Sequence, residues 1–103
     1  MQELQSDDLK TFLENNQKAI VLYGAAWCGV CRVIKPKFVG LANERTDIAF
    51  IYVDAEKYPG ARQFAEVTNL PTFAGFVDGK LVLQKMGSKE EAIMEVVNEV
   101  TGN

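Results

Sequence analysis

The two cysteines of this chain, Cys28 and Cys31, are its only ones, and they lie close together within residues 27–31. A strand-like apolar run, Ile20–Tyr23, precedes the pair, and a helix-like run, Arg32–Glu44, follows it. We therefore expect the pair at the tip of a strand and in the first turn of a helix, where a Cys-x-x-Cys pair is typical of a redox dithiol. A disulfide across so short a gap closes a tiny loop and removes little entropy from the unfolded chain, so stability is a poor reason for the pair.

The composition predicts one ordinary globular domain over residues 1–103. Apolar residues make up 48% and charged residues 24%, which is enough apolar surface for a core. The net charge of -3 argues against a nucleic-acid partner. The first twenty residues hold acids and amides without an apolar run, which predicts neither a signal peptide nor a membrane anchor. We therefore expect a cytoplasmic monomer with no membrane partner, in a compartment where structural disulfides are rare.

Apolar periodicity and turn residues predict an alternation of helices and strands. Ser6 is expected to cap the first helix, and Ser88 the last. The expected elements are a helix ending at Asn15-Asn16, a strand over 18–24, a helix from the cysteine pair to about Glu44, a strand within 47–54, a helix over 60–67, strands over 72–77 and 80–86, a helix closed by Thr101-Gly102, and a short edge strand within 1–5.

This order of elements predicts an α/β fold. Parallel crossovers followed by a hairpin at Asp78-Gly79 give a mixed central β-sheet of four to five strands with helices on both faces. Pro36 should kink the second helix, because it removes a backbone donor. The side chains expected to face the core from this helix are Val33, Ile34, Phe38 and Leu41, and the phenylalanines expected in the core are Phe12, Phe38, Phe50, Phe64, Phe73 and Phe76.

Four landmarks follow one another along the chain: Trp-Cys-Gly-Val-Cys over 27–31, Pro36 in the next helix, Leu-Pro-Thr over 70–72, and Gly87 after the hairpin. In these landmarks the chain resembles the thioredoxin family over almost its whole length. The resemblance implies the thioredoxin fold and a cis bond before Pro71, with Pro71 facing the two sulfurs. It also implies a protein-disulfide reductase that acts on disulfide-containing client proteins and is recycled by a thioredoxin reductase. Its redox centre would be its own cysteine pair, without an added cofactor.

The chain departs from the family pattern at three positions. Val30 stands where thioredoxins carry proline, and Leu22 stands where they carry a buried aspartate. Phe50 is expected at the position of a lysine that often partners that aspartate. Replacing both partners of a buried polar pair can be neutral, whereas losing one leaves a buried charge unpaired. We hypothesise that Leu22 leaves Cys31 without an internal proton acceptor.

The position of the cysteines assigns each sulfur a role. Cys28 is expected to be the nucleophile, because free N–H groups and the dipole at a helix start favour a thiolate. Cys31 lies one turn deeper, should be less exposed, and is expected to resolve the mixed disulfide. Nearby cationic side chains either raise the local potential or form a solvated helix face; they are Arg32, Lys35 and Lys37.

The absence of histidine from the sequence limits the alternatives. A Cys–His pair for acyl transfer cannot form, and no imidazole lies between the cysteines, which favours a reductant over an oxidant. Two thiols cannot supply the four ligands of a structural zinc site within one chain, so no metal is expected. Two alternatives stay open. One is a disulfide oxidant or isomerase of the same fold, because Gly29-Val30 could shift the potential upward; the other is a redox-inactive binding module.

The surroundings of the cysteines predict a client-binding surface. Trp27 is either a core aromatic or a partly exposed ring that shields the sulfurs and contacts clients. The backbone of Leu70 can pair with an extended client segment if Pro71 is cis. An apolar rim around the sulfurs, with Thr72 beside it, completes the expected substrate-binding set: Val30, Leu70, Pro71, Thr72 and Gly87.

Overall fold

The chain alternates strands and helices in the computed structural model, which describes residues 1–102. The elements in chain order are β1 (Gln2–Glu3), α1 (Leu9–Glu14), β2 (Lys18–Gly24), α2 (Gly29–Glu44), β3 (Ala49–Asp54), α3 (Pro59–Arg62), β4 (Thr72–Val77), β5 (Lys80–Met86) and α4 (Glu90–Thr101).

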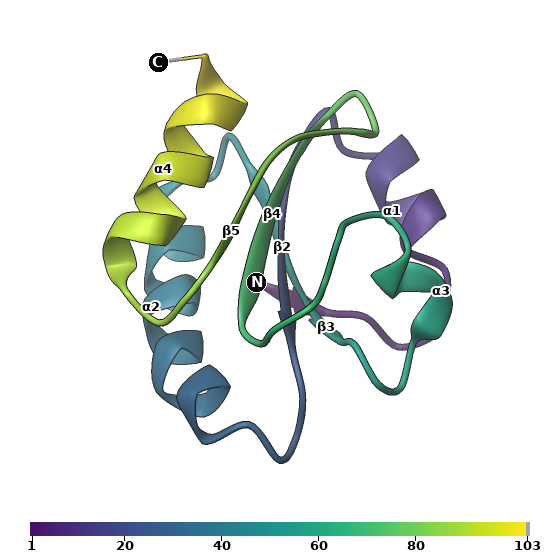
Figure 1. Cartoon of the computed structure of the whole chain (residues 1–103). Coiled ribbons are helices and arrows are strands. Elements are labelled where there is room, and N and C mark those ends of the chain that lie inside the picture. Colours follow the sequence, from purple (N-terminus) through teal and green to yellow (C-terminus); the bar gives the residue numbers. More distant parts are fainter. Residues whose placement is uncertain (103) are drawn as a thin grey trace.

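The strands form one five-stranded sheet in the order β1-β3-β2-β4-β5. β1 and β2 both run parallel to β3, whereas β4 and β5 are antiparallel to their neighbours. Helices α2 and α4 cover one face, and α1 and α3 cover the other (Figure 1). The predicted α/β class, with a mixed sheet and helices on both faces, is confirmed.

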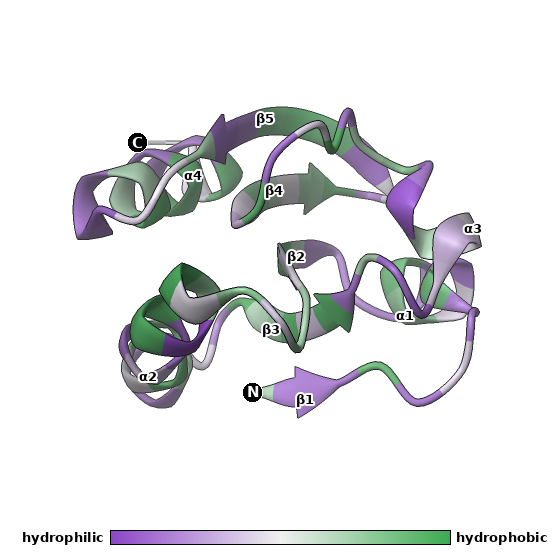
Figure 2. Ribbon diagram, turned by 60° about the horizontal axis from the view of Figure 1, so that its bottom comes forward, coloured by the Kyte–Doolittle hydropathy of each residue, from purple (hydrophilic) through white to green (hydrophobic). Residues whose placement is uncertain are grey.

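Two apolar clusters lie on the two faces of the sheet, and the alternation of side chains along β2 supplies both. Val21 and Tyr23 pack with α1 and α3, while Ile20 and Leu22 pack with α2 and α4. Figure 2 shows the sheet between these two pairs of helices. Since β2 is central and covered on both sides, its apolar run is nearly continuous rather than alternating.

The hairpin between β4 and β5 forms at the predicted residues. Asp78 and Gly79 both have positive φ, 53° and 79°, which is the geometry of a two-residue type I′ turn. Glycine adopts this conformation without steric cost, and aspartate tolerates it. The turn therefore fixes the pairing of β4 with β5, although a bulge shifts the register between Gly75 and Phe76.

The first predicted helix cap is wrong. The Asp8 carboxylate, and not Ser6, caps α1 by accepting the Thr11 N–H at 3.4 Å. Asp7 instead accepts the backbone N–H groups of Gly60 and Ala61, each at 2.8 Å, and so links the N-terminal segment to the start of α3. Ser6, Asp7 and Asp8 are adjacent and could each cap the helix. Asp7 is engaged by α3, which is distant in sequence, and Asp8 is the residue that caps α1.

The later helices also depart from their predicted limits. At α4 the capping position is held by Lys89, which makes no side-chain capping bond, and not by Ser88. α3 ends at Arg62 and does not continue to residue 67. Gly102 closes α4, as predicted, and it does so in the left-handed conformation, with φ of 82°.

One face of α2 was predicted with an error of a single residue. Its buried positions are spaced three and four apart, which is the helical repeat; they are Cys31, Ile34, Phe38 and Leu41. Val33 falls outside this repeat and is 71% exposed, so its predicted core position is wrong. Phe64 is likewise exposed, because it follows the short α3 in a surface turn. α2 continues through Pro36 as one helix.

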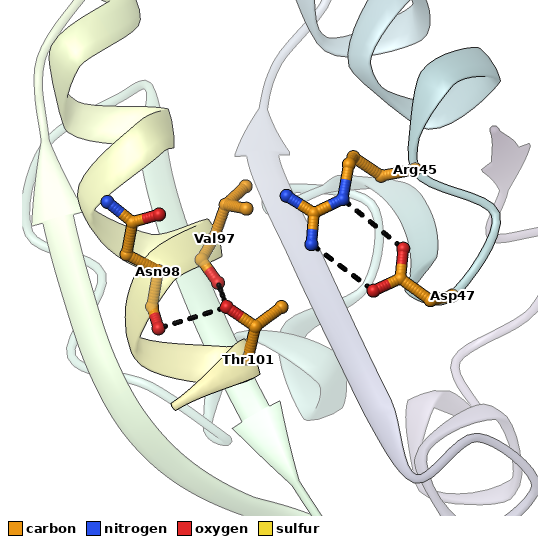
Figure 3. A network of polar contacts seen from close by, with 5 residues as sticks. All are labelled: Arg45, Asp47, Val97, Asn98 and Thr101. Atoms are coloured by element: carbon orange, nitrogen blue, oxygen red, sulfur yellow. Dashed lines mark hydrogen bonds and ion pairs between the residues drawn. The ribbon is translucent and has the colours of Figure 1, made fainter. Parts of the chain in front are cut away.

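The far end of α2 meets solvent near the last turn of α4. Arg45 contacts the Asp47 carboxylate through two nitrogens, and the Thr101 hydroxyl donates to the carbonyl groups of Val97 and Asn98 (Figure 3).

Within residues 1–102, none of the helices has the length and apolar character needed to cross a membrane.

Candidate redox site

The two sulfurs lie where β2 leads into α2. Cys28 is the N-cap residue of α2, and its sulfur is bonded to that of Cys31 across a Cα–Cα distance of 5.3 Å. The backbone N–H of Cys31 points at the Cys28 sulfur, at 3.2 Å. The loop before the helix is held by the Cys28 N–H, which donates to the Ala25 carbonyl at 3.1 Å. The predicted position of the pair, at a strand end and a helix start, is confirmed.

The helix start favours negative charge on Cys28 once the disulfide is reduced. The first N–H groups of a helix have no partner within it, and the dipole is positive at this end. One of these groups already meets the Cys28 sulfur, so a thiolate there would accept a charge-assisted hydrogen bond. Cys28 is 6% exposed and Cys31 is 1% exposed. The expectation that Cys31 is the less exposed sulfur is therefore confirmed.

Apolar side chains flank the disulfide. Trp27 is 64% exposed, so its alternative interpretation as a core aromatic is wrong, and Val30 is 47% exposed. Leu70 packs against the small cluster formed by Ala25 and the two cysteines. Gly29, the first residue of α2, is also exposed.

The segment before β4 adopts the expected backbone geometry. The Leu70–Pro71 bond is cis, which confirms that expectation. The Gly87 N–H donates to the Pro71 carbonyl at 3.2 Å, so the third and fourth sequence landmarks are in direct contact.

Thr72 lies beneath this surface and not on it. Its side chain is fully buried, and its hydroxyl donates to the Asn69 carbonyl at 2.6 Å. Its backbone pairs with Tyr23 on one side and Met86 on the other. Pro71 is buried as well and Leu70 is half-buried, so the exposed members of the predicted substrate-binding set are Val30 and Gly87.

The neighbour of Leu22 on β3 is Tyr52, not Phe50. Leu22 is fully buried and pairs with Tyr52, while Phe50 pairs with Ile20. Phe50 lies on the neighbouring strand, as expected, and shares the apolar cluster of Leu22, but its direct pairing partner is Ile20. Residues two apart on a strand face the same side, so the hydrophobic pattern alone could not tell which of them pairs with Leu22.

A cavity of about 390 Å³ adjoins Cys31, and sequence reasoning did not anticipate it. It lies on the side of α2 that faces β3 and the edge strand β1. The lining residues are Glu3, Ala25, Ala26, Cys31, Arg32, Lys35, Tyr52 and Asp54. Lys35 follows Cys31 by four positions, a spacing that could have placed both on one side of a helix. Glu3 gave no such signal, because its contact depends on the pairing of a two-residue strand.

Charged and phenolic groups meet at this cavity. The ammonium of Lys35 forms an ion pair with the Glu3 carboxylate and lies 4.2 Å from the centre of the Tyr52 ring. Burial raises the pKa of Tyr52, and the negative charges of Asp54 and Glu3 raise it further. Tyr52 is therefore a neutral phenol at physiological pH. Within residues 1–102, no group of three or more His, Cys, Asp or Glu side chains is arranged to hold a metal ion.

Comparison with known proteins gives concordant matches. The sequence model of the family described as Thioredoxin matches residues 1–99. Thioredoxin-3 of Dictyostelium discoideum is 34% identical over 88 residues, which cover 85% of this chain and 84% of that protein. Thioredoxin H2 of Arabidopsis thaliana is 30% identical over 84% of this chain, and the match covers 65% of that protein. The solved structure of Fasciola hepatica thioredoxin has a TM-score of 0.86 at 34% identity, covering 96% of this chain and 99% of that chain. The matched region includes the whole sheet and the cysteine-bearing helix.

Proposed function

The chain belongs to the thioredoxin family and is a thiol–disulfide oxidoreductase that reduces protein disulfides, and we propose that Cys28 is its attacking sulfur and Cys31 its resolving sulfur. The observation that carries this assignment is the hydrogen bond from the Cys31 N–H to the Cys28 sulfur at the helix N-cap. It places a backbone donor on the sulfur of Cys28, which is also the more exposed of the two cysteines.

The reaction proceeds in two exchanges. The Cys28 thiolate attacks a client disulfide, so that one client sulfur leaves as a thiolate and a mixed disulfide forms. The Cys31 thiolate then attacks the Cys28 sulfur, the internal disulfide forms, and the second client sulfur leaves. Two electrons pass from the cysteine pair to the client, and the released thiolates take protons from solvent. Cys31 is tethered beside the bond that it breaks, so proximity supplies much of the rate of the second exchange.

We propose that clients dock on the exposed apolar surface around the disulfide. Trp27 and Val30 present large apolar side chains there, and Leu70 packs directly on the cysteine cluster. Displacing water from such a surface favours contact with many protein segments. Gly87, which is exposed and donates its N–H to the carbonyl of the buried Pro71, completes this surface on the side of β4 and β5.

The oxidised pair has to be reduced again after each cycle, and we propose a flavoprotein thioredoxin reductase as the electron donor. A cytoplasmic location fits this cycle, because thiols stay reduced there. The presence of only one close cysteine pair in the sequence agrees with that compartment. Neither the oxidant or isomerase alternative nor the inactive binding module is favoured by the thioredoxin relatives.

The assignment of the sulfurs is tested by trapping the mixed disulfide. Cys31→Ser should form a stable covalent complex with a disulfide-containing model protein, which dithiothreitol releases, because the second exchange is blocked. Cys28→Ser is the matched control and should form none. Non-reducing electrophoresis and intact mass would read both variants. Trapping by Cys28→Ser in place of Cys31→Ser would reverse the assignment, and trapping by neither would refute the exchange itself.

A further inference from the structure

A row of side chains crosses the sheet beneath α2. Glu3 of β1 pairs with Tyr52 of β3, and Tyr52 pairs with Leu22 of β2. Paired residues of neighbouring strands project from the same face, so all three point toward α2. The row passes from the exposed carboxylate of Glu3, through the half-buried ring of Tyr52, to the fully buried side chain of Leu22. A polar edge therefore leads into the apolar core below the cysteines.

Tyr52 fits into this row because position 24 is a glycine. A β-carbon on Gly24 would lie 2.8 Å from both the Cε2 and the hydroxyl oxygen of Tyr52. The phenol thus lies against the backbone at the end of β2, just before the Ala25-Ala26 segment that also lines the cavity. This close contact fixes the ring over which the ammonium of Lys35 is held.

Lys35 brings a positive charge to the side of α2 that carries Cys31. Residues four apart on a helix are neighbours on one side, and both residues line the same cavity. Its ammonium is bound by the Glu3 carboxylate and the Tyr52 ring, and its side chain is only 32% exposed. β1 is the edge strand of the sheet, and β3 separates it from β2. The Glu3 carboxylate therefore lies at the edge of the sheet, beyond Tyr52 of β3.

The other charges around the cavity come from α2 and β3. Arg32, on α2, is exposed, and Asp54 ends β3. One oxygen of Asp54 already accepts the N–H groups of Glu56 and Lys57, at 3.0 and 3.1 Å. Ala25 and Ala26 carry no charge, and Leu22 contributes none from β2. Lys35 is therefore the cation that is held in place by side-chain partners and lines the same cavity as Cys31.

We propose that Lys35 is a positioning residue for the resolving step: its ammonium, held by Glu3 and Tyr52, favours the thiolate of Cys31, and water in the cavity accepts the proton. This inference rests on the proposed roles of the two cysteines. The Cys31 thiol releases its proton to solvent in the cavity, and its thiolate attacks the Cys28 sulfur of the mixed disulfide. The Cys31–Cys28 bond forms as the bond from Cys28 to the client breaks. The client sulfur departs with the electron pair, and Lys35 keeps its proton throughout.

The experiment follows both exchanges with a stoichiometric amount of dithiobisnitrobenzoate, which releases a yellow thiolate at each step. The first phase reports attack by Cys28, and the second reports resolution by Cys31. Lys35→Met removes the charge but keeps most of the apolar stem, and Lys35→Arg restores a cation. Lys37→Met is the matched control, because Lys37 is exposed on the same helix and is not among the cavity residues. Urea unfolding of each variant verifies that the fold is intact.

Lys35→Met should move the pH midpoint of the second phase upward and slow that phase at neutral pH by about threefold, which corresponds to roughly half a pKa unit. The first phase should change less, Lys35→Arg should recover most of the rate, and the effect should shrink at high salt because screening weakens it. An unmoved midpoint in Lys35→Met, or an equal shift in Lys37→Met, would overturn the role of Lys35. Loss of the first phase from the unmodified chain would instead refute the proposed function.

Discussion

The two ends of α2 place polar atoms in opposite surroundings. At the N-terminal end, the Cys28 sulfur is almost fully buried and meets the N–H of Cys31 at 3.2 Å. Beyond the C-terminal end, Arg45 meets Asp47 in solvent, with nitrogen–oxygen distances of 3.3 and 3.2 Å (Figure 3). One helix thus begins at a nearly buried sulfur that meets a backbone donor and ends at an exposed ion pair.

A close polar contact is expected to have larger consequences where it is buried than where it is exposed to solvent. The hydrogen bond from Arg45 lowers the pKa of Asp47, and the same hydrogen bond raises the pKa of Arg45. Water and salt screen this exposed pair, so it contributes little to stability. Near Cys28 the lower effective dielectric strengthens the interaction of a charge with the helix N–H groups. The N-terminal, buried end of α2 is therefore where the helix can stabilise a charged sulfur most strongly.

The largest effect is expected when a carboxylate is placed near the buried end. Leu22 is fully buried in the cluster that contains Ile34 and Phe38. Leu22→Asp should lower the free energy of unfolding by about 4 kcal/mol, because leucine packing is lost and a polar group is buried. Burial should raise the pKa of this new carboxyl, whereas the pKa of Asp47 is lowered.

The pH dependence of this variant tests the contrast directly. A carboxyl whose pKa is raised in the folded state holds its proton better there than in the unfolded chain, so the destabilisation of Leu22→Asp should grow as the pH rises above about 4. Leu22→Asn, which cannot ionise, should show no such slope. Urea titrations at several pH values measure both variants. A loss of stability in Leu22→Asp that does not depend on pH would contradict the burial of position 22 away from water.

The same variant should change the pH profile of the resolving step, and an unchanged profile counts against the hypothesis that Leu22 leaves Cys31 without an internal proton acceptor.

Intermediate effects are expected along the buried face of α2 itself. Ile34 is 1% exposed and lies one turn from Cys31, whereas Leu41 is 9% exposed and lies near the open end. Ile34→Ala should lower the free energy of unfolding by about 3 kcal/mol and Leu41→Ala by about 2 kcal/mol, because the site at the open end can partly rehydrate. Chemical denaturation of the two variants compares the ends without altering any charge. A larger loss for Leu41→Ala would reverse the proposed gradient.

The sequence predicts the parts of the fold that local patterns determine. β2, β4 and β5 begin and end at the predicted residues, since continuous apolar runs and the Asp78-Gly79 turn delimit them. The cysteine pair also falls at a helix start, because a strand and a helix pattern meet there. In each of these places, propensity, periodicity and turn chemistry agree, which is when sequence reasoning is most secure.

What the sequence could not predict depends on contacts between distant elements. Asp7 and Asp8 are chemically equivalent as caps, and only the contact of Asp7 with α3 assigns the cap of α1 to Asp8. Tyr52 and Phe50 face the same side of β3, so only the register with β2 identifies the neighbour of Leu22. The cavity beside Cys31 requires β1, β3 and α2 together. Tertiary geometry, which no local pattern encodes, decides all three.

The smallest effect is expected at the hydrated end. Asp47→Asn removes the acid of the exposed pair, and its unfolding midpoint should stay close to that of the unmodified chain at neutral pH, more so in high salt. The folded-state pKa of Asp47 is lowered, so its small stabilisation is present above the ordinary value of 3.8 and is lost as the pH falls through the folded-state value. Stability curves of the two proteins should therefore differ slightly at neutral pH and converge in acid. A large difference at neutral pH, or curves that diverge as the pH falls, would show that the pair is coupled to the core and that the contrast between the two ends of α2 is weaker than their exposure indicates.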